Sequence, residues 1–281
     1  MHEPILQDWD LLAAPGDKQR GAPDLPVDDW KLQRIEDADH PAFADAYAAL
    51  RVEFGHSGEV ESADVLRARL EGPRVTSTGH TLHYHLYTLT DPEGRLAAVR
   101  DHTVIAPHQE EQETLVHLSH ALVLPEGRGL GIGALLRTLP VLDAQLVRSS
   151  PQRVTLVAEM EHPDLSENLP PDQRQARERR LDVYERAGFA MIEPYTAAYA
   201  QPCFTDDPEY PVVPLRLIVR RVDRELFKNV PSRQARKIVA ALYAMYAADL
   251  PAAAMAKVLP RLERMPDTDK TLPLLPPTLA L

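Results

Sequence analysis

The stretch from Val123 to Leu136, Val-Leu-Pro-Glu-Gly-Arg-Gly-Leu-Gly-Ile-Gly-Ala-Leu-Leu, places an apolar strand end before a glycine-rich loop and an apolar helix. Glycines allow the main chain to turn tightly and to approach a ligand closely. The first amide groups of a helix have no partners within it, and the helix dipole adds partial positive charge there. Arg128 adds a planar cation that suits phosphate oxygens. The sequence therefore predicts a pyrophosphate-binding loop at this junction.

The type of ligand is not fixed by the loop alone. The spacing Gly129-x-Gly131-x-x-Ala134 fits the fingerprint of a dinucleotide-binding unit, and Glu159 or Glu161 ends the next predicted strand. Such a unit usually places its loop after the first strand of a βαβ segment, whereas three strand-like segments come first here. This order argues against a nicotinamide cofactor, and a glycine-rich turn that binds nothing remains open.

A second motif, Tyr184-Glu185-Arg186-Ala187-Gly188-Phe189, ends one predicted helix and begins a strand. Together with Val123-x-Pro125 and Arg128-x-x-Gly131-x-Gly133, it resembles the signature of the GNAT N-acetyltransferase superfamily. The resemblance covers residues 114–189, and the earlier segments agree in their order only. The family often has Asn and Ala where this chain has Arg177 and Arg180. Arg177 is therefore either a substitute phosphate ligand or part of a solvated basic face.

The resemblance implies an α/β fold of the GNAT (acyl-CoA N-acyltransferase) type, with a mixed, mostly antiparallel sheet that is split at the cofactor site. We expect an irregular arm over 1–29, the acyltransferase domain over 30–222, and a helical extension with a Pro- and Leu-rich tail over 223–281. Alternation, helical spacing and turn residues predict the elements of the domain. Strands are expected at 30–36, 81–90, 96–106, 114–124, 153–160, 189–193 and 214–222, and helices at 40–55, from Ser62 to before Gly72, at 133–147 and at 173–186.

The resemblance also implies acetyl-CoA as the cofactor and direct transfer of its acetyl group to a primary amine in a ternary complex. The main chain of Leu122 and Val123 is expected to bond the pantetheine arm like an added strand. The pyrophosphate is expected on Arg128, Gly129, Leu130, Gly131, Ile132 and Gly133. Tyr184 is the predicted acid that protonates the leaving thiolate, although an amphipathic core role is its alternative.

An amine with a pKa near 10 is only about 0.1% neutral at pH 7, so a base is needed. Many relatives have a glutamate six residues before the motif valine, and this chain has His117 there. Histidine changes its protonation state near neutral pH, which makes His117 the predicted base. His120, Glu159 and Glu161 are the alternatives, and a strand histidine without a role is a further one.

A cluster of histidines lies on the second and third predicted strands. His83, His85 and Tyr87 alternate and therefore share one face, with His102 on the neighbouring strand. No carboxylate is close in sequence and no cysteine spacing accompanies them, so no metal site is expected. An acceptor pocket and a plain sheet surface remain as interpretations of this face.

Composition restricts the classes of function. The chain has 281 residues and a formal net charge of −11, which argues against nucleic-acid binding because that requires a basic face. Cys203 is the single cysteine, so no internal disulfide is expected and a reducing, cytoplasmic location fits. The sequence shows no secretion signal and no apolar run of about 18 residues, so no membrane contact is expected.

The partner class is a small-molecule or peptide amine, whose identity the sequence does not define. Apolar stripes in the extension are expected to pack on the domain or to form a homodimer surface. The first stripe holds Val239, Leu242, Tyr243 and Tyr246, and the second holds Met255, Val258, Leu259 and Leu262. A non-catalytic acyl-CoA-binding or interaction protein with the same fold is the main alternative function, and a Rossmann oxidoreductase is a lesser one.

Overall fold

The computed structural model describes residues 13–19, 29–55, 60–107, 113–147, 153–166, 168–204, 212–222 and 228–280. The chain divides into two compact units. Unit 1 comprises Met1–Val75 and Gly79–Val154, and unit 2 comprises Thr76–Thr78 and Thr155–Leu281. The division falls inside the predicted acyltransferase domain, and each unit is described by itself.

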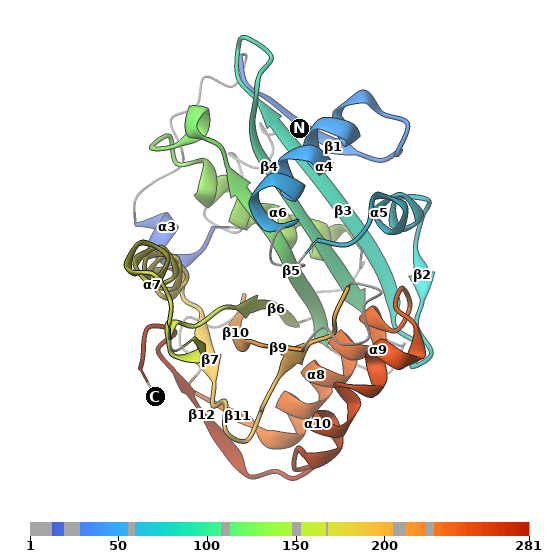
Figure 1. Ribbon diagram of the computed structural model, residues 1–281, viewed down its shortest axis with the longest axis vertical. Helices are drawn as coiled ribbons and strands as arrows, with labels where there is room; N and C mark the ends of the chain where they lie inside the picture. Colours follow the sequence, from blue (N-terminus) through green and yellow to red (C-terminus); the bar gives the residue numbers. More distant parts are fainter. Residues whose placement is uncertain are drawn as a thin grey trace. The chain divides into compact units, whose positions relative to one another are not determined.

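Unit 1 is built on an antiparallel sheet (Figure 1). Its strands lie in the order β1, β3, β4, β5, and a short β2 also pairs with β3. Their bounds are Lys31–Ile35 for β1, Arg74–Val75 for β2, Thr81–Thr90 for β3, Leu96–Ala106 for β4 and Glu113–Val123 for β5. The predicted strand positions are confirmed within two residues. A dinucleotide-binding unit requires parallel strands, so the antiparallel β4–β5 pair before the loop contradicts the Rossmann alternative.

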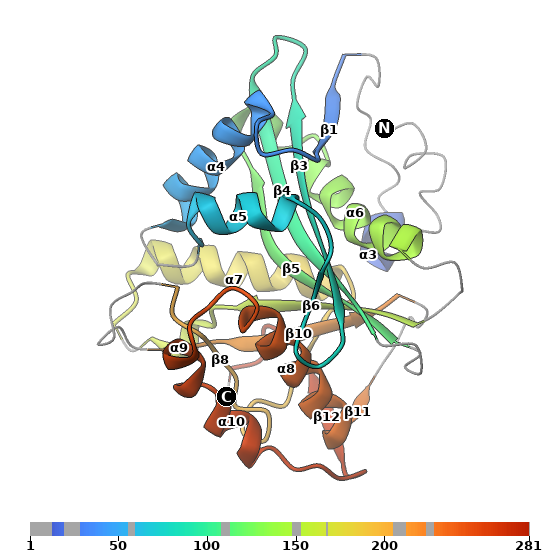
Figure 2. The same ribbon diagram turned by 90° about the vertical axis from the view of Figure 1, so that its right-hand side faces the viewer.

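Helices cover both faces of the unit 1 sheet. In Figure 2, α4 (Pro41–Phe54) and α5 (Ala63–Leu70) lie on one face, and α6 (Ile132–Val147) lies on the other. The α4 and α5 face buries Phe43, Leu50 and Leu66 against Leu86 and other sheet residues. Because side chains alternate along a strand, the neighbouring residues of β3 point toward α6.

Within the predicted N-terminal arm, the structure describes one short helix, α3 (Pro15–Lys18). Its Asp17 carboxylate accepts two hydrogen bonds from Arg137 of α6, at 2.7 and 2.8 Å. Asp17 and Arg137 therefore join the arm to the helix that follows the glycine-rich loop.

Unit 2 holds the remaining strands. Antiparallel pairs join β6 (Arg153–Met160, whose first two residues belong to unit 1) to β10 (Arg216–Arg221), and β10 to β7 (Ala190–Ile192). Beyond β7 lie β12 (Thr271–Leu275) and β11 (Asn229–Pro231), and β8 (Ala200–Gln201) pairs separately with β9 (Val213–Pro214). The mostly antiparallel α/β class is thus confirmed. The predicted split involves β5 and β6, which belong to different units, and stays a prediction.

The C-terminal extension contains helices and strands. Its helices are α8 (Ser232–Tyr246), α9 (Ala252–Ala256) and α10 (Leu259–Arg264). The stripe Val239, Leu242, Tyr243 and Tyr246 is at most 2% exposed, so it packs inside the protein and does not supply a dimer surface. The tail adds β12 to the sheet, which the sequence analysis missed because Pro273 interrupts the strand pattern.

No helix among the described residues combines the length and the apolar character needed to cross a bilayer.

Candidate functional site

The glycine-rich loop joins β5 to α6 in unit 1. After a 3₁₀ turn at Pro125–Gly127, the main chain takes positive φ at Gly129 (+81°) and at Gly131 (+77°). These values suit glycine and disfavour residues with a Cβ. The first helical hydrogen bonds are already made, since Ala134 and Leu135 donate to the carbonyl of Gly131 at 2.9 and 3.3 Å.

The amide groups of residues 129–133 form a row of donors. Among the hydrogen bonds of the described residues, none has an N–H of this row as its donor. Gly129, Leu130 and Gly131 are exposed, and so is Arg128, whose Nε lies 3.4 Å from the carbonyl oxygen of Val123. The structure thus brings the residues of the predicted loop together at a helix N-terminus, where unpaired amide groups and the helix dipole favour negative charge.

Gly127 is a residue that the sequence analysis did not single out. A Cβ there would lie 2.8 Å from Cδ1 of Ile132 and 3.0 Å from the carbonyl oxygen of Ala97. The loop can therefore fold back onto β4 and α6 only with glycine at this position, and its packing fixes the direction in which the donor row points.

Tyr184 lies in unit 2 on α7 (Pro171–Arg186). The helix ends in a Schellman motif, in which Phe189 N–H donates to the carbonyl of Tyr184 and Gly188 N–H donates to that of Glu185. Gly188 has a φ of +83°, and the rings of Tyr184 and Phe189 meet edge to face at 5.0 Å. Helix capping thus explains part of the second motif. Tyr184 is half-buried, and the role of its hydroxyl as the acid that protonates the leaving thiolate stays a prediction.

The two histidines of β5 differ in their partners. The register between β4 and β5 shifts between Asp101 and Thr103, so His117 and His120 face the same side. Nδ1 of His120 lies 3.0 Å from Oδ1 of Asp101, which also accepts the His120 main-chain N–H at 2.8 Å. His117 instead has Ser119 Oγ at 3.2 Å from its Nδ1.

Asp101 is ionised in this arrangement. Burial would raise the pKa of Asp101, but the nearby His120 and its hydrogen bond, with help from Arg100 and Tyr84, lower it to about 2. Asp101 therefore holds the imidazole of His120 in place, as an orienting carboxylate does beside a general base.

The two other candidate bases are in unit 2, and both are engaged. Glu159 accepts hydrogen bonds from Tyr199 and, at 2.5 Å, from Tyr246. Glu161 pairs with Arg177, which is only 16% exposed at its side chain. The prediction of a solvated basic face is therefore wrong for Arg177, which is partly buried against Glu161. Arg179 and Arg180 of the same face are exposed.

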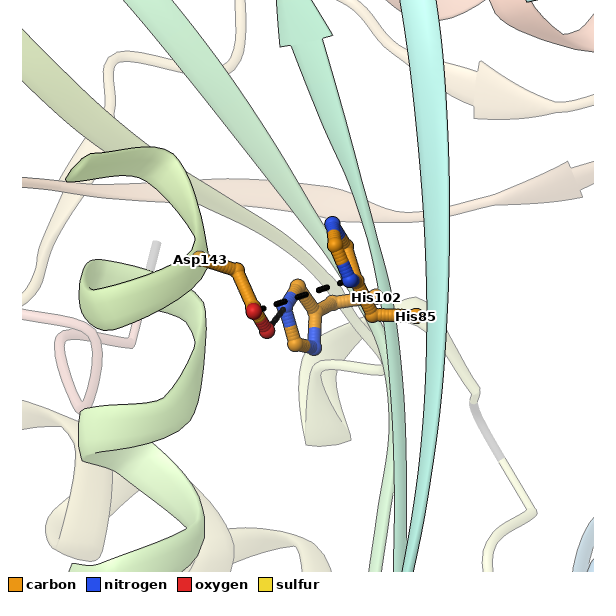
Figure 3. A group of neighbouring side chains, drawn as sticks. All are labelled: His85, His102 and Asp143. Atoms are coloured by element: carbon orange, nitrogen blue, oxygen red, sulfur yellow. Dashed lines mark hydrogen bonds and ion pairs between the residues drawn. The ribbon is translucent and has the colours of Figure 1, made fainter. Parts of the chain in front are cut away.

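The histidines on the α6 face of the sheet form a buried cluster with a residue that the sequence analysis missed (Figure 3). His85, His102 and Asp143 are 3%, 0% and 1% exposed, so the interpretation as plain sheet surface is wrong for them. Asp143 Oδ2 lies 2.9 Å from Nε2 of His102, and Oδ1 lies 3.6 Å from Nδ1 of His85. Tyr87 donates to both carboxylate oxygens at 2.9 Å.

The cluster combines an ionised carboxylate with neutral imidazoles. Burial, then repulsion from His102, lowers the pKa of His85 to about 3, and burial also lowers the pKa of His102. Burial would raise the pKa of Asp143, but its hydrogen bonds with His102 and Tyr87 outweigh burial and leave that pKa below its usual value. His83, in contrast, lines a pocket of about 150 Å³ together with Arg34, Glu36 and Arg69 among others.

No protein-family model matches this chain. No curated protein matches it either. Solved structures of N-acetyltransferases align with parts of it.

One of these is a GCN5-related glucosamine N-acetyltransferase region of a fungal multidomain protein (15% identity, TM-score 0.38), which aligns over 58% of this chain and 17% of that one. Spermidine N-acetyltransferase from Vibrio cholerae, in complex with CoA and spermine, aligns over 71% of this chain and 99% of that one, at 11% identity and a TM-score of 0.39. A GNAT-family protein from Desulfovibrio desulfuricans aligns over 68% of this chain and 97% of that one, at 20% identity and a TM-score of 0.35. This chain thus spans about a sixth of the fungal protein, and none of these likenesses defines an activity for it.

Proposed function

We propose that this protein is an N-acetyltransferase that moves an acetyl group from acetyl-CoA to a primary amine within a ternary complex. The observation that carries the proposal is the row of amide donors at residues 129–133, which is exposed over 129–131 and is positioned by Gly129 and Gly131 at the N-terminus of α6. Five consecutive donors beside Arg128 match the charge and the size of a diphosphate. The motif around Tyr184 supports an acyl-CoA as the ligand to which this diphosphate belongs.

In this proposal the pyrophosphate binds the loop, with Arg128 as its counter-ion. The main chain of Leu122 and Val123, at the end of β5, bonds the pantetheine arm like an added strand. Because Cys203 is the only cysteine, the chain cannot form an internal disulfide, and we assign the protein to the cytoplasm, where acetyl-CoA and a reducing environment coincide.

Ligand-dependent stability tests the class of cofactor. A ligand that binds only the folded state raises the melting temperature. Acetyl-CoA and CoA are expected to stabilise the full chain, whereas NAD and NADP are expected to leave it unchanged. Stabilisation by NAD species without CoA would contradict the proposal. Binding of acetyl-CoA without turnover on a panel of polyamines, amino sugars, amino acids and peptides would instead favour a non-catalytic acyl-CoA-binding protein.

For the base, the structure favours His120, because Asp101 orients its imidazole, and His117 is the alternative. Replacing the base lowers kcat by about 100-fold or more, and the deficit is largest near neutral pH. We therefore expect His120→Ala to show this loss in steady-state kinetics and His117→Ala to show a smaller one. Circular dichroism checks the fold of both variants, and the reverse ranking would assign the role to His117.

For the acid, Tyr184→Phe is expected to lower kcat by about 100-fold while leaving the Kd for acetyl-CoA nearly unchanged. Phenylalanine retains the ring that packs on Phe189, so the helix end is preserved and only the hydroxyl is lost. Tyr195→Phe is the matched control, since Tyr195 is 73% exposed. Normal turnover together with a large loss of acetyl-CoA affinity would rule out the proposed role of Tyr184.

A further inference from the structure

The cluster of His85, His102 and Asp143 is set between the sheet of unit 1 and α6, away from the glycine-rich loop in sequence. Two strands and one helix supply its members, since His85 lies on β3, His102 on β4 and Asp143 on α6. Opposed imidazoles with one carboxylate are the donors that zinc and similar divalent transition metals bind.

The geometry points to a buried divalent transition-metal site formed by His85, His102 and Asp143, with zinc as the expected ion. One potential ligand atom from each residue lies within 4.8 Å of the other two. Metal–ligand bonds of about 2.0–2.1 Å in a tetrahedral site place neighbouring donor atoms about 3.3 Å apart. The separations of 2.9 Å from His102 Nε2 to Asp143 Oδ2 and 3.6 Å from His85 Nδ1 to Asp143 Oδ1 lie on either side of that value, each imidazole facing a different oxygen of the carboxylate.

Unsatisfied ring nitrogens are a second, independent observation. Among the residues that the structure describes, neither Nδ1 nor Nε2 of His85 has a hydrogen-bond partner, and Nδ1 of His102 has none either. Buried polar atoms are normally paired, because an unpaired one keeps its desolvation penalty of about 1–3 kcal/mol. A metal ion supplies the missing partner of His85. His102 can bind through Nε2 once its proton moves to Nδ1, which changes the tautomer and not the charge.

A comparison on the opposite face of the same sheet strengthens this inference. There, Asp101, His120 and Tyr84 form a similar carboxylate–histidine–tyrosine group, with Tyr84 donating to Asp101 at 3.0 Å. None of these three residues is among those with an unpaired buried side-chain atom. The polar atoms of the Asp101 group are thus paired by its hydrogen bonds, whereas the group around Asp143 retains unpaired imidazole nitrogens.

The surroundings suit a ligand set. Tyr87 donates to both oxygens of Asp143, as outer hydrogen bonds do when they orient a ligating carboxylate. Two cations oppose metal binding. Arg34 Nη1 lies 3.8 Å from Asp143 Oδ1, with its side chain 30% exposed. Burial and, after it, the charge of the buried Arg100 lower the pKa of His102. Glu36 partly offsets the charge of Arg34, with its Oε1 3.7 Å from Arg34 Nε.

The test uses the full chain, unfolded in urea with a chelator and refolded with or without zinc, so that burial does not block entry. After gel filtration, elemental analysis is expected to find about one zinc per chain in the wild type, with a raised melting temperature. Cobalt(II) is expected to give visible absorption bands of a tetrahedral ion. His85→Leu is expected to lose the retained zinc and the cobalt absorption bands. It is expected to fold without metal, because the substitution removes no side-chain hydrogen bond among the described residues.

His83→Leu is the matched control, since His83 is on the same strand and the same face but outside the cluster, and it is expected to keep the zinc. Arg34→Gln is expected to bind zinc at least as tightly as the wild type, because a nearby cation is removed. Absence of retained zinc in the refolded wild type, or equal retention by His85→Leu, would overturn the inference.

Discussion

Replacing Gly129 with aspartate is expected to raise the Kd for acetyl-CoA by about 100-fold, equivalent to about 2.7 kcal/mol. The new carboxylate would stand beside the amide donors of residues 129–133, where it competes for them and repels the diphosphate. Like charges brought together at a binding surface cost several kcal/mol. Isothermal titration of acetyl-CoA into the purified variant measures the change.

Gly94→Asp is the matched control for this experiment. Gly94 has a φ of +80°, against +81° for Gly129, and a Cβ at either position meets nothing within 4 Å. Both substitutions therefore carry the same backbone penalty, of roughly 1–2 kcal/mol, and the same added charge. Gly94 lies in the β3–β4 turn, so its variant is expected to bind acetyl-CoA normally. Equal affinities for the two variants would show that the loop is not the cofactor site.

Replacing Asp143 with alanine is expected to lower the free energy of unfolding by about 2–6 kcal/mol, because two buried donors lose their acceptor at about 1–3 kcal/mol each. The carboxylate is 1% exposed, and its loss leaves the Tyr87 hydroxyl and the His102 imidazole without an acceptor. Urea denaturation in the presence of a chelator, followed by circular dichroism, measures this change without a contribution from bound metal.

Two further variants separate the causes. Asp143→Asn keeps an oxygen acceptor of the same shape and is expected to be less destabilised than the alanine variant. Asp182→Ala removes a carboxylate that is 55% exposed and 2.7 Å from Arg186, and it is expected to change stability by less than about 1 kcal/mol. A loss from Asp143→Ala as small as that from Asp182→Ala would mean that the buried network adds little to stability.

Local sequence signals predicted most of the elements. The strands β3 and β4 follow from alternation and from the turn residues between them, Asp91-Pro92-Glu93-Gly94, of which Gly94 takes the positive φ that such turns need. The loop before α6 was predicted because glycines with required backbone angles leave a direct mark on the sequence. Both features depend only on residues that are near one another in the chain.

Contacts between residues far apart in the chain could not be predicted from these local signals. Asp143 lies 41 residues from His102, and nothing in its helix shows that this aspartate is buried. The absence of a local carboxylate had argued against a metal site, but the carboxylate comes from a helix across the sheet. The sequence predicts the helix end at Gly188, but it does not show that the rings of Tyr184 and Phe189 pack against each other there.

Two buried aspartates lie on opposite faces of the unit 1 sheet, Asp101 of β4 with Tyr84 and His120 on one face and Asp143 of α6 against His102 on the other. Asp143 joins the helix to β3 and β4 through three hydrogen bonds. The helix that begins with the donor row is therefore anchored near its other end before any ligand arrives. In the proposed cofactor complex, the diphosphate would meet a preorganised surface without the entropy cost of ordering a loose helix, which leaves more of its interaction energy for affinity.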